Sequence, residues 1–182
     1  MAILILGLLL WVAGHFFKRL LPGVHDGLGN GAKGIAAVAI LLGVVLMVIG
    51  YRDWISPQVW YPPAFMVHIN NLLMLLAVYL YAASGTKARA GVGMRHPQLI
   101  GFKTWAVAHL LVNGDLASIV LFGGLLAWAV AEVIVINRSQ PDWTKARWGG
   151  TSAEIKAVVG TVVAFVVIAA IHWWLGYSPF PG

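Results

Sequence analysis

Six long apolar segments fill most of this chain and restrict it to one kind of fold. They lie near residues 1–17, 34–51, 65–83, 97–113, 116–136 and 157–176, and each approaches the roughly 20 apolar residues with which an α-helix crosses a bilayer. Only 10% of the residues are charged and 60% are hydrophobic, a balance unlike that of a soluble domain. We therefore expect an all-α, polytopic transmembrane helical bundle of about six spans, formed as one domain over residues 1–182 and surrounded by membrane lipid.

The basic residues alternate between loops in a way that predicts the orientation of the spans. The first, third and fifth loops hold three, three and four Lys or Arg residues, which is ten of the twelve, whereas the other loops and both termini hold only Arg52. Because basic loops stay on the cytoplasmic side, we expect both termini to lie outside, in the periplasm if the membrane is a bacterial inner membrane. The net charge of +6 then reflects topology, and we expect no nucleic-acid partner.

The fourth and fifth spans are predicted to form a tight antiparallel hairpin, since only residues 113–115 separate them. Gly114 is typical of a helix C-terminus. Asp115 is typical of the N-cap that follows, where a carboxylate meets the positive end of the helix dipole.

The same hairpin predicts an ion pair near the inner surface. Folding the chain at Gly114 sets Glu132 level with Arg95 and His96, because each lies about 18 residues from the turn at the same rise per residue.

A glycine-rich segment follows the first span and contains the spacing Gly29-x-Gly31-x-x-Gly34. This spacing matches the dinucleotide-binding fingerprint as text, but no strand precedes it and no βαβ unit surrounds it. We expect a flexible cytoplasmic loop there.

Six histidines and no cysteine limit the metal chemistry open to the chain. The lack of cysteine excludes iron–sulfur clusters with cysteine ligands, a thiolate haem ligand and covalent c-type attachment, so any haem must be b-type and held by other side chains. His25 is expected to be solvated in the glycine-rich loop. His172 is expected in an interfacial aromatic belt with Trp173 and Trp174. The remaining candidates for ligands inside the membrane are His15, His68, His96 and His109.

The fourth span places its two histidines on different faces. His96 and His109 are 13 residues apart, which at about 100° per residue leaves them roughly 220° apart around the helix. His109 shares a face with Phe102, Trp105 and Asn113, an aromatic surface with one amide that would suit a planar hydrophobic cofactor.

The first and third spans each offer a partner for that face. His15 follows Gly14, which would let another helix or a flat ring approach closely. Lys18 and Arg19 nearby can reach the headgroups or pair with a haem propionate. His68, with Asn71 one turn on, is a rival partner at the outer level.

With these residues in view, the chain resembles the NnrU family over nearly its whole length, most strongly across RHPQLIGFKTWAVAHLLVNGD, residues 95–115. That family is associated with nitric-oxide and nitrite metabolism in denitrifying bacteria. It includes the plant zeta-carotene isomerase, a membrane enzyme that uses b-type haem to isomerise a cis double bond in a carotenoid precursor.

The resemblance implies haem b as the cofactor, with His15 in VAGHFFKRLL and His109 in WAVAHLLVNGD as the axial iron ligands. It also implies that His96 belongs to the RHP motif without being a ligand. The chain departs from the plant enzyme at Tyr51-Arg52 and at Trp128, where that enzyme has functional histidines. These departures argue against carotenoid isomerisation more than against haem binding.

A second, shorter resemblance is to membrane methyltransferases that use S-adenosylmethionine. Arg95 and His96 at the start of a span, with Gly101 after them, are similar to a motif of those enzymes, although their Glu/Arg-rich C-terminal region is missing here.

Two classes of function stay open at this level. One is a redox enzyme or isomerase for a hydrophobic or nitrogen-oxide substrate. The other is a non-catalytic membrane factor that supports respiratory nitrogen-oxide reductase components.

Overall fold

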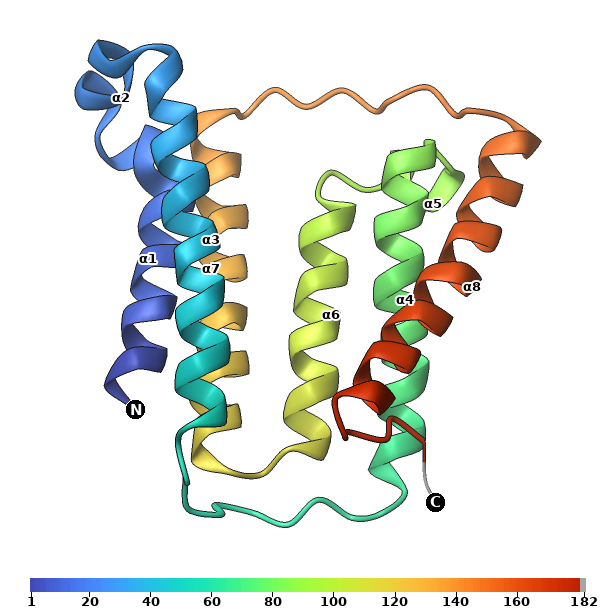
Figure 1. The fold of residues 1–182 in the computed structure, drawn as a ribbon. Coiled ribbons are helices and arrows are strands. Elements are labelled where there is room, and N and C mark those ends of the chain that lie inside the picture. The colour runs from blue at the N-terminus through green and yellow to red at the C-terminus, as the bar shows by residue number, and fades with distance from the viewer. Residues whose placement is uncertain (181–182) are drawn as a thin grey trace. The chain divides into compact units, whose positions relative to one another are not determined.

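The computed structural model describes residues 1–180, which are mainly helical and contain no β-strand (Figure 1). The helices are α1 (Ala2–Leu20), α2 (Pro22–Leu28), α3 (Asn30–Arg52), α4 (Met66–Thr86), α5 (Arg89–Gly93), α6 (Pro97–Val112), α7 (Leu116–Ser139) and α8 (Thr151–Trp174). Helices α1, α3, α4, α7 and α8 are long and apolar enough to cross a membrane. The predicted all-α, polytopic membrane bundle is confirmed.

Helix α6 is the predicted fourth span, and it is shorter than the others. Its 16 residues rise about 24 Å, less than the roughly 30 Å of a hydrocarbon core. The chain continues at Asn113 in an extended conformation, with φ −120° and ψ 109°. An extended residue advances about 3.3 Å, whereas a helical residue advances about 1.5 Å. Asn113 therefore extends the segment farther than one more helical residue would.

Contacts along the chain define two compact units. Unit one comprises residues 1–60 and 114–128, and thus α1, α2, α3 and the first part of α7. Unit two comprises residues 61–113 and the chain from Ala129 onward, and thus α4, α5, α6, the rest of α7 and α8.

In unit one, α1 and α3 lie side by side (Figure 1) and approach closely through glycines. A Cβ atom on Gly50 would lie 2.3 Å from the backbone nitrogen of Leu4, and one on Gly43 would lie 2.9 Å from the carbonyl oxygen of Gly7. Small residues at such crossings let membrane helices pack backbone to backbone.

The glycine-rich segment is helical, so the prediction of a flexible loop there is wrong. Pro22 occupies the first turn of α2, a position that its fixed φ favours. Gly29, with φ +53°, makes the turn into α3, which then contains Gly31 and Gly34. His25 is half-buried rather than solvated, because it packs against Phe17 of α1 and its Nδ1 lies 3.1 Å from Asp26 Oδ1.

In unit two, α5, α6 and α8 all pack on α4. Gly101 allows α6 to approach α4, since its Cβ would lie 2.9 Å from the Ala77 carbonyl oxygen. Ala83, Ala88 and Ala157 form a fully buried cluster between α4, α5 and α8. Small side chains thus determine the spacing of the helices in this unit as well.

The connection between α6 and α7 confirms one predicted role and corrects another. Asp115 caps α7, because its Oδ1 accepts a hydrogen bond from the Ser118 backbone N–H at 2.9 Å. Gly114, by contrast, is not a left-handed C-cap. A Cβ there would lie 1.9 Å from the Trp60 carbonyl oxygen, so glycine is required by the close approach of residues 57–60.

The predicted ion pair of Glu132 with Arg95 or His96 is wrong for the described chain. His96 Nε2 lies 2.8 Å from Asn137 Oδ1, and Arg95 donates to the carbonyl oxygens of Gln140 and Pro141. His96 therefore meets α7 at Asn137, five residues beyond Glu132.

Candidate functional site

His109 lies on α6 in unit two, with its ring held by its own helix. The Nδ1 atom lies 3.0 Å from the Trp105 carbonyl oxygen, and the side chain is half-buried. Since a carbonyl only accepts hydrogen bonds, Nδ1 carries the proton and, in the neutral ring, Nε2 carries a lone pair. The ring centroids of Trp105 and His109 are 5.0 Å apart, and those of Phe102 and Trp105 are 5.1 Å apart. The predicted aromatic face is confirmed.

His15 in unit one has the same local geometry. Its Nδ1 atom lies 2.8 Å from the Trp11 carbonyl oxygen, which again makes Nε2 the atom with the lone pair. Its ring lies 4.3 Å from that of Trp11 and 4.5 Å from that of Trp128, centroid to centroid. Trp128 is buried. His15 is therefore enclosed by indole rings from α1 and α7.

A Trp-x-x-x-His spacing thus occurs twice, as Trp11 with His15 and as Trp105 with His109. In a helix, residues four apart are stacked on one face, so each indole covers its histidine while its carbonyl orients the imidazole. The role of Trp11 was not predicted, although this repeated spacing is visible in the sequence. The role of Trp128 could not be predicted in the same way, because that contact joins segments distant in the sequence.

His172 on α8 is a third histidine with this backbone bond, and its surroundings differ from the predicted ones. Its Nδ1 lies 2.8 Å from the Ile168 carbonyl oxygen, and its ring centroid lies 6.5 Å from that of His109. Trp173 and Trp174 are 73% and 84% exposed, whereas His172 is half-buried. The two tryptophans fit an interfacial belt, and His172 turns toward α6.

The other candidates lie apart from these rings or are engaged elsewhere. His68 is exposed, and Asn71 donates to the Pro179 carbonyl oxygen at 3.0 Å. His96 contacts Asn137. The Asn113 side-chain amide donates to the His109 carbonyl oxygen at 2.8 Å, so it ties down the end of α6, and a direct contact of Asn113 with a cofactor stays a prediction.

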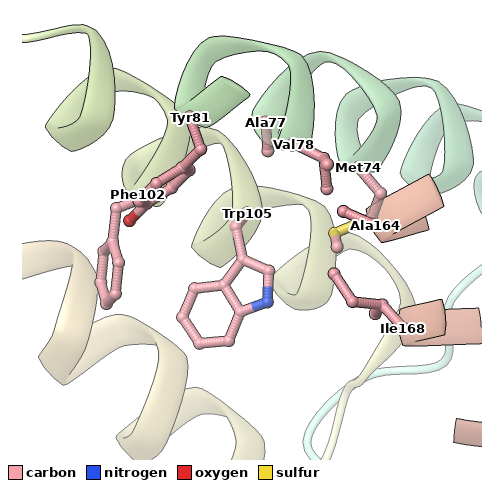
Figure 2. A pocket seen from close by; sticks show the side chains of 8 residues that line it. All are labelled: Met74, Ala77, Val78, Tyr81, Phe102, Trp105, Ala164 and Ile168. Carbon is pink, nitrogen blue, oxygen red and sulfur yellow. The ribbon is translucent and has the colours of Figure 1, made fainter. Parts of the chain in front are cut away.

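An apolar pocket of about 350 Å³ in unit two borders Trp105. Figure 2 shows the Trp105 indole extending into it, with Tyr81 contributing a hydroxyl group. Helices α4, α6 and α8 form its walls, with Met74, Ala77, Val78, Tyr81, Phe102, Trp105, Ala164 and Ile168 as the lining residues. A hydrophobic or aromatic group would be compatible with this lining.

Within residues 1–180, no three His, Asp or Glu side chains gather as a metal-binding group. A site with three or more protein ligands, as is usual for zinc, therefore has no candidate among these residues. Haem iron needs fewer ligands from the protein, because the porphyrin supplies four and the protein adds one or two.

The residues of the short methyltransferase motif make contacts between segments of unit two. Arg95 donates to the loop after α7, His96 contacts Asn137, and Gly101 packs on α4. Nothing in these contacts favours a nucleotide-like ligand, and the methyltransferase reading stays a prediction.

The fold defines an α-helical, multi-pass membrane protein with two half-buried histidines that pack against tryptophan rings. The chain belongs to the NnrU family, whose model, described as NnrU protein, matches residues 3–179. Neither a curated protein nor a solved structure matches the chain.

Proposed function

We propose that this protein binds b-type haem in the membrane, with His15 and His109 as the axial ligands, and takes part in redox metabolism of nitrogen oxides. The observation that carries the proposal is that the two imidazole rings make the same hydrogen bond to the backbone. Each donates Nδ1–H to a backbone carbonyl and thereby presents Nε2 as an electron-pair donor. The pairing of these two residues on one iron comes from the family resemblance.

The residues present fit this cofactor. A haem needs neutral imidazole nitrogen and an apolar, aromatic surface, and both histidines are covered by tryptophan. The Nδ1 bonds fix the ring orientation and raise the basicity of Nε2, as carbonyl partners do for metal-bound histidines. When bound, haem would supply an iron that exchanges single electrons, and two histidine ligands suit electron transfer or redox sensing.

The tryptophans would keep water from the site. Trp128 is buried and its ring lies 5.1 Å from that of Trp11, edge to face. Exclusion of water strengthens electrostatic interactions at the cofactor. At the cytoplasmic end of α1, Lys18 is exposed and long enough to pair with a propionate.

The placement in the cell that we propose is the bacterial inner membrane, with both termini in the periplasm. The distribution of Lys and Arg between alternate loops supports this orientation.

The partner class that we propose is a respiratory nitrogen-oxide reductase component. A catalyst and a supporting factor differ in one simple respect. The detergent-purified protein should convert a nitrogen-oxide substrate alone if it is a catalyst, and should co-purify with a reductase component if it is a factor.

The ligand assignment is tested by single substitutions to alanine in the full-length protein. His15→Ala and His109→Ala should each lower haem occupancy or convert the iron from low to high spin, because an axial nitrogen is lost. His25→Ala is the control and should leave the absorption spectrum unchanged, because the His25 ring packs against Phe17 and is not one of the proposed ligands. If His68→Ala alone had the ligand phenotype, the pair would instead be His68 and His109.

A further inference from the structure

The loop between α7 and α8, residues 140–150, is fastened at its first end to the segment that precedes α6. The Arg95 guanidinium donates to the carbonyl oxygens of Gln140 and Pro141. Arg95 directly precedes the N-cap residue of α6, so this contact holds the start of the loop against the start of α6. The loop cannot swing away without breaking charge-assisted hydrogen bonds.

A second fastening holds the other end of the loop. The Trp148 indole N–H and the Arg89 backbone N–H both donate to Glu154 Oε1, each at 2.8 Å. The Arg89 guanidinium lies 4.3 Å from the centre of the Trp148 ring, within the range of a cation–π interaction. In addition, the Gly149 N–H donates to the Lys87 carbonyl oxygen at 3.0 Å.

Between these fastenings, residues 142–147 are exposed. Their side chains make no hydrogen bond or ion pair with any other part of the chain that the structure describes. The segment has no helical turn and is drawn out between α7 and α8 (Figure 1). Its exposed side chains include Trp143, Lys145 and Arg147.

The position of this loop limits what those three side chains can meet. Both α7 and α8 are long and apolar enough to cross a membrane, and only 11 residues join them, so the loop must stay near the headgroups. Tryptophan is enriched at that level, and Lys and Arg there attract anionic lipids.

We propose that residues 142–147 bind the headgroups of anionic phospholipids, with Lys145 and Arg147 on the phosphates and Trp143 at the headgroup boundary. Charge complementarity favours this occupant, because Lys145 and Arg147 outnumber Asp142 and further exposed cations, Arg138 and Lys156, flank the loop. The two fastenings hold the segment in place before lipid arrives, which lowers the entropy lost on binding.

Native mass spectrometry of the full-length protein in detergent tests this proposal, with phosphatidylglycerol and phosphatidylcholine as probes. The loop variant is Lys145→Gln with Arg147→Gln. The matched control is Lys33→Gln with Arg52→Gln, which removes the same charge from exposed positions of unit one. We expect phosphatidylglycerol to bind the loop variant roughly tenfold to thirtyfold more weakly than wild type and the control variant. Phosphatidylcholine should be retained equally by all three.

The outcomes separate lipid from other anions. Equal binding of phosphatidylglycerol by wild type and the loop variant, or an equal loss in both variants, would overturn the proposal. Competition by soluble glycerol phosphate as strong as by the lipid would identify a free-anion site instead. A loop variant that lost binding only to poly-glutamate would indicate an acidic protein partner.

A charge-conserving variant guards against misfolding as the cause. Lys145→Arg with Arg147→Lys should keep phosphatidylglycerol binding within about threefold of wild type, because both cations remain. If this variant lost the lipid as fully as the loop variant, the effect would not be electrostatic and the proposal would fail.

Discussion

At the N-terminus of α7, the Asp115 carboxylate organises the polar end of unit one. It accepts hydrogen bonds from the Ser118 N–H, the Ser118 hydroxyl and the Ser56 hydroxyl, and the Tyr51 hydroxyl lies 2.8 Å from Ser118 Oγ. Burial raises the pKa of Asp115, but the hydrogen bonds from Ser118 and Ser56 outweigh this effect, so that its pKa lies below the ordinary value. The folded state therefore favours the charged form.

Replacing this cap should weaken the fold in a pH-dependent way. Asp115→Ala removes an N-cap and should lower the free energy of unfolding by about 0.5–2 kcal/mol. Asp115→Asn retains a capping oxygen and should cost less. Because the folded pKa is depressed, the carboxylate's contribution is complete above its unfolded pKa of about 3.9 and is lost as the pH falls through the lower folded value.

Thermal unfolding of wild type and Asp115→Asn in one detergent checks this dependence. The difference in Tm should be constant near neutral pH and should shrink below about pH 4. A difference that grew on acidification would contradict the assigned direction of the pKa shift.

At the scale of elements, unit two is secured by a few polar contacts at the ends of its helices. Glu154 in the first turn of α8 joins α5 to the preceding loop by accepting from both Arg89 and Trp148. Glu154→Ala would leave two donors without their acceptor, whereas Glu154→Gln would keep an acceptor oxygen. We expect faster amide hydrogen exchange at residues 148–150 in the alanine variant, with the glutamine variant close to wild type. Equal exchange in the two variants would show that this carboxylate does not fasten the loop.

The element boundaries show where sequence patterns succeed and where they fail. Hydropathy predicted every long helix, because crossing a membrane demands a long apolar run. It missed α2, whose seven residues PGVHDGL are too short and too polar to stand out. It also misjudged the level of Glu132, because hydropathy does not reveal which residue of α7 the start of α6 contacts.

At the scale of the whole molecule, only part of the candidate site could be predicted, because sequence patterns group residues of one helix and not residues of distant segments. Periodicity along one helix correctly grouped His109 with Trp105, since residues four apart share a face. The contact of His15 with Trp128 and the approach of His172 to His109 depend on packing between distant segments. No local pattern encodes such contacts.

The orientation of the chain is testable with reporter fusions. The positive-inside distribution predicts that a reporter active only in the periplasm works when fused after Gly182. The same reporter placed within residues 140–150 should fail, since that loop is predicted to be cytoplasmic. The opposite pattern would mean that the number of spans is wrong by one.

The central claim is that intramembrane histidines of this protein hold a b-type haem. Its most direct test is the pyridine haemochrome spectrum of the full-length protein purified from haem-replete cells. The claim predicts the α-band of haem b, with the pigment fully extracted by acidified organic solvent because the chain has no cysteine to form a thioether bond. A colourless preparation of folded protein would contradict it.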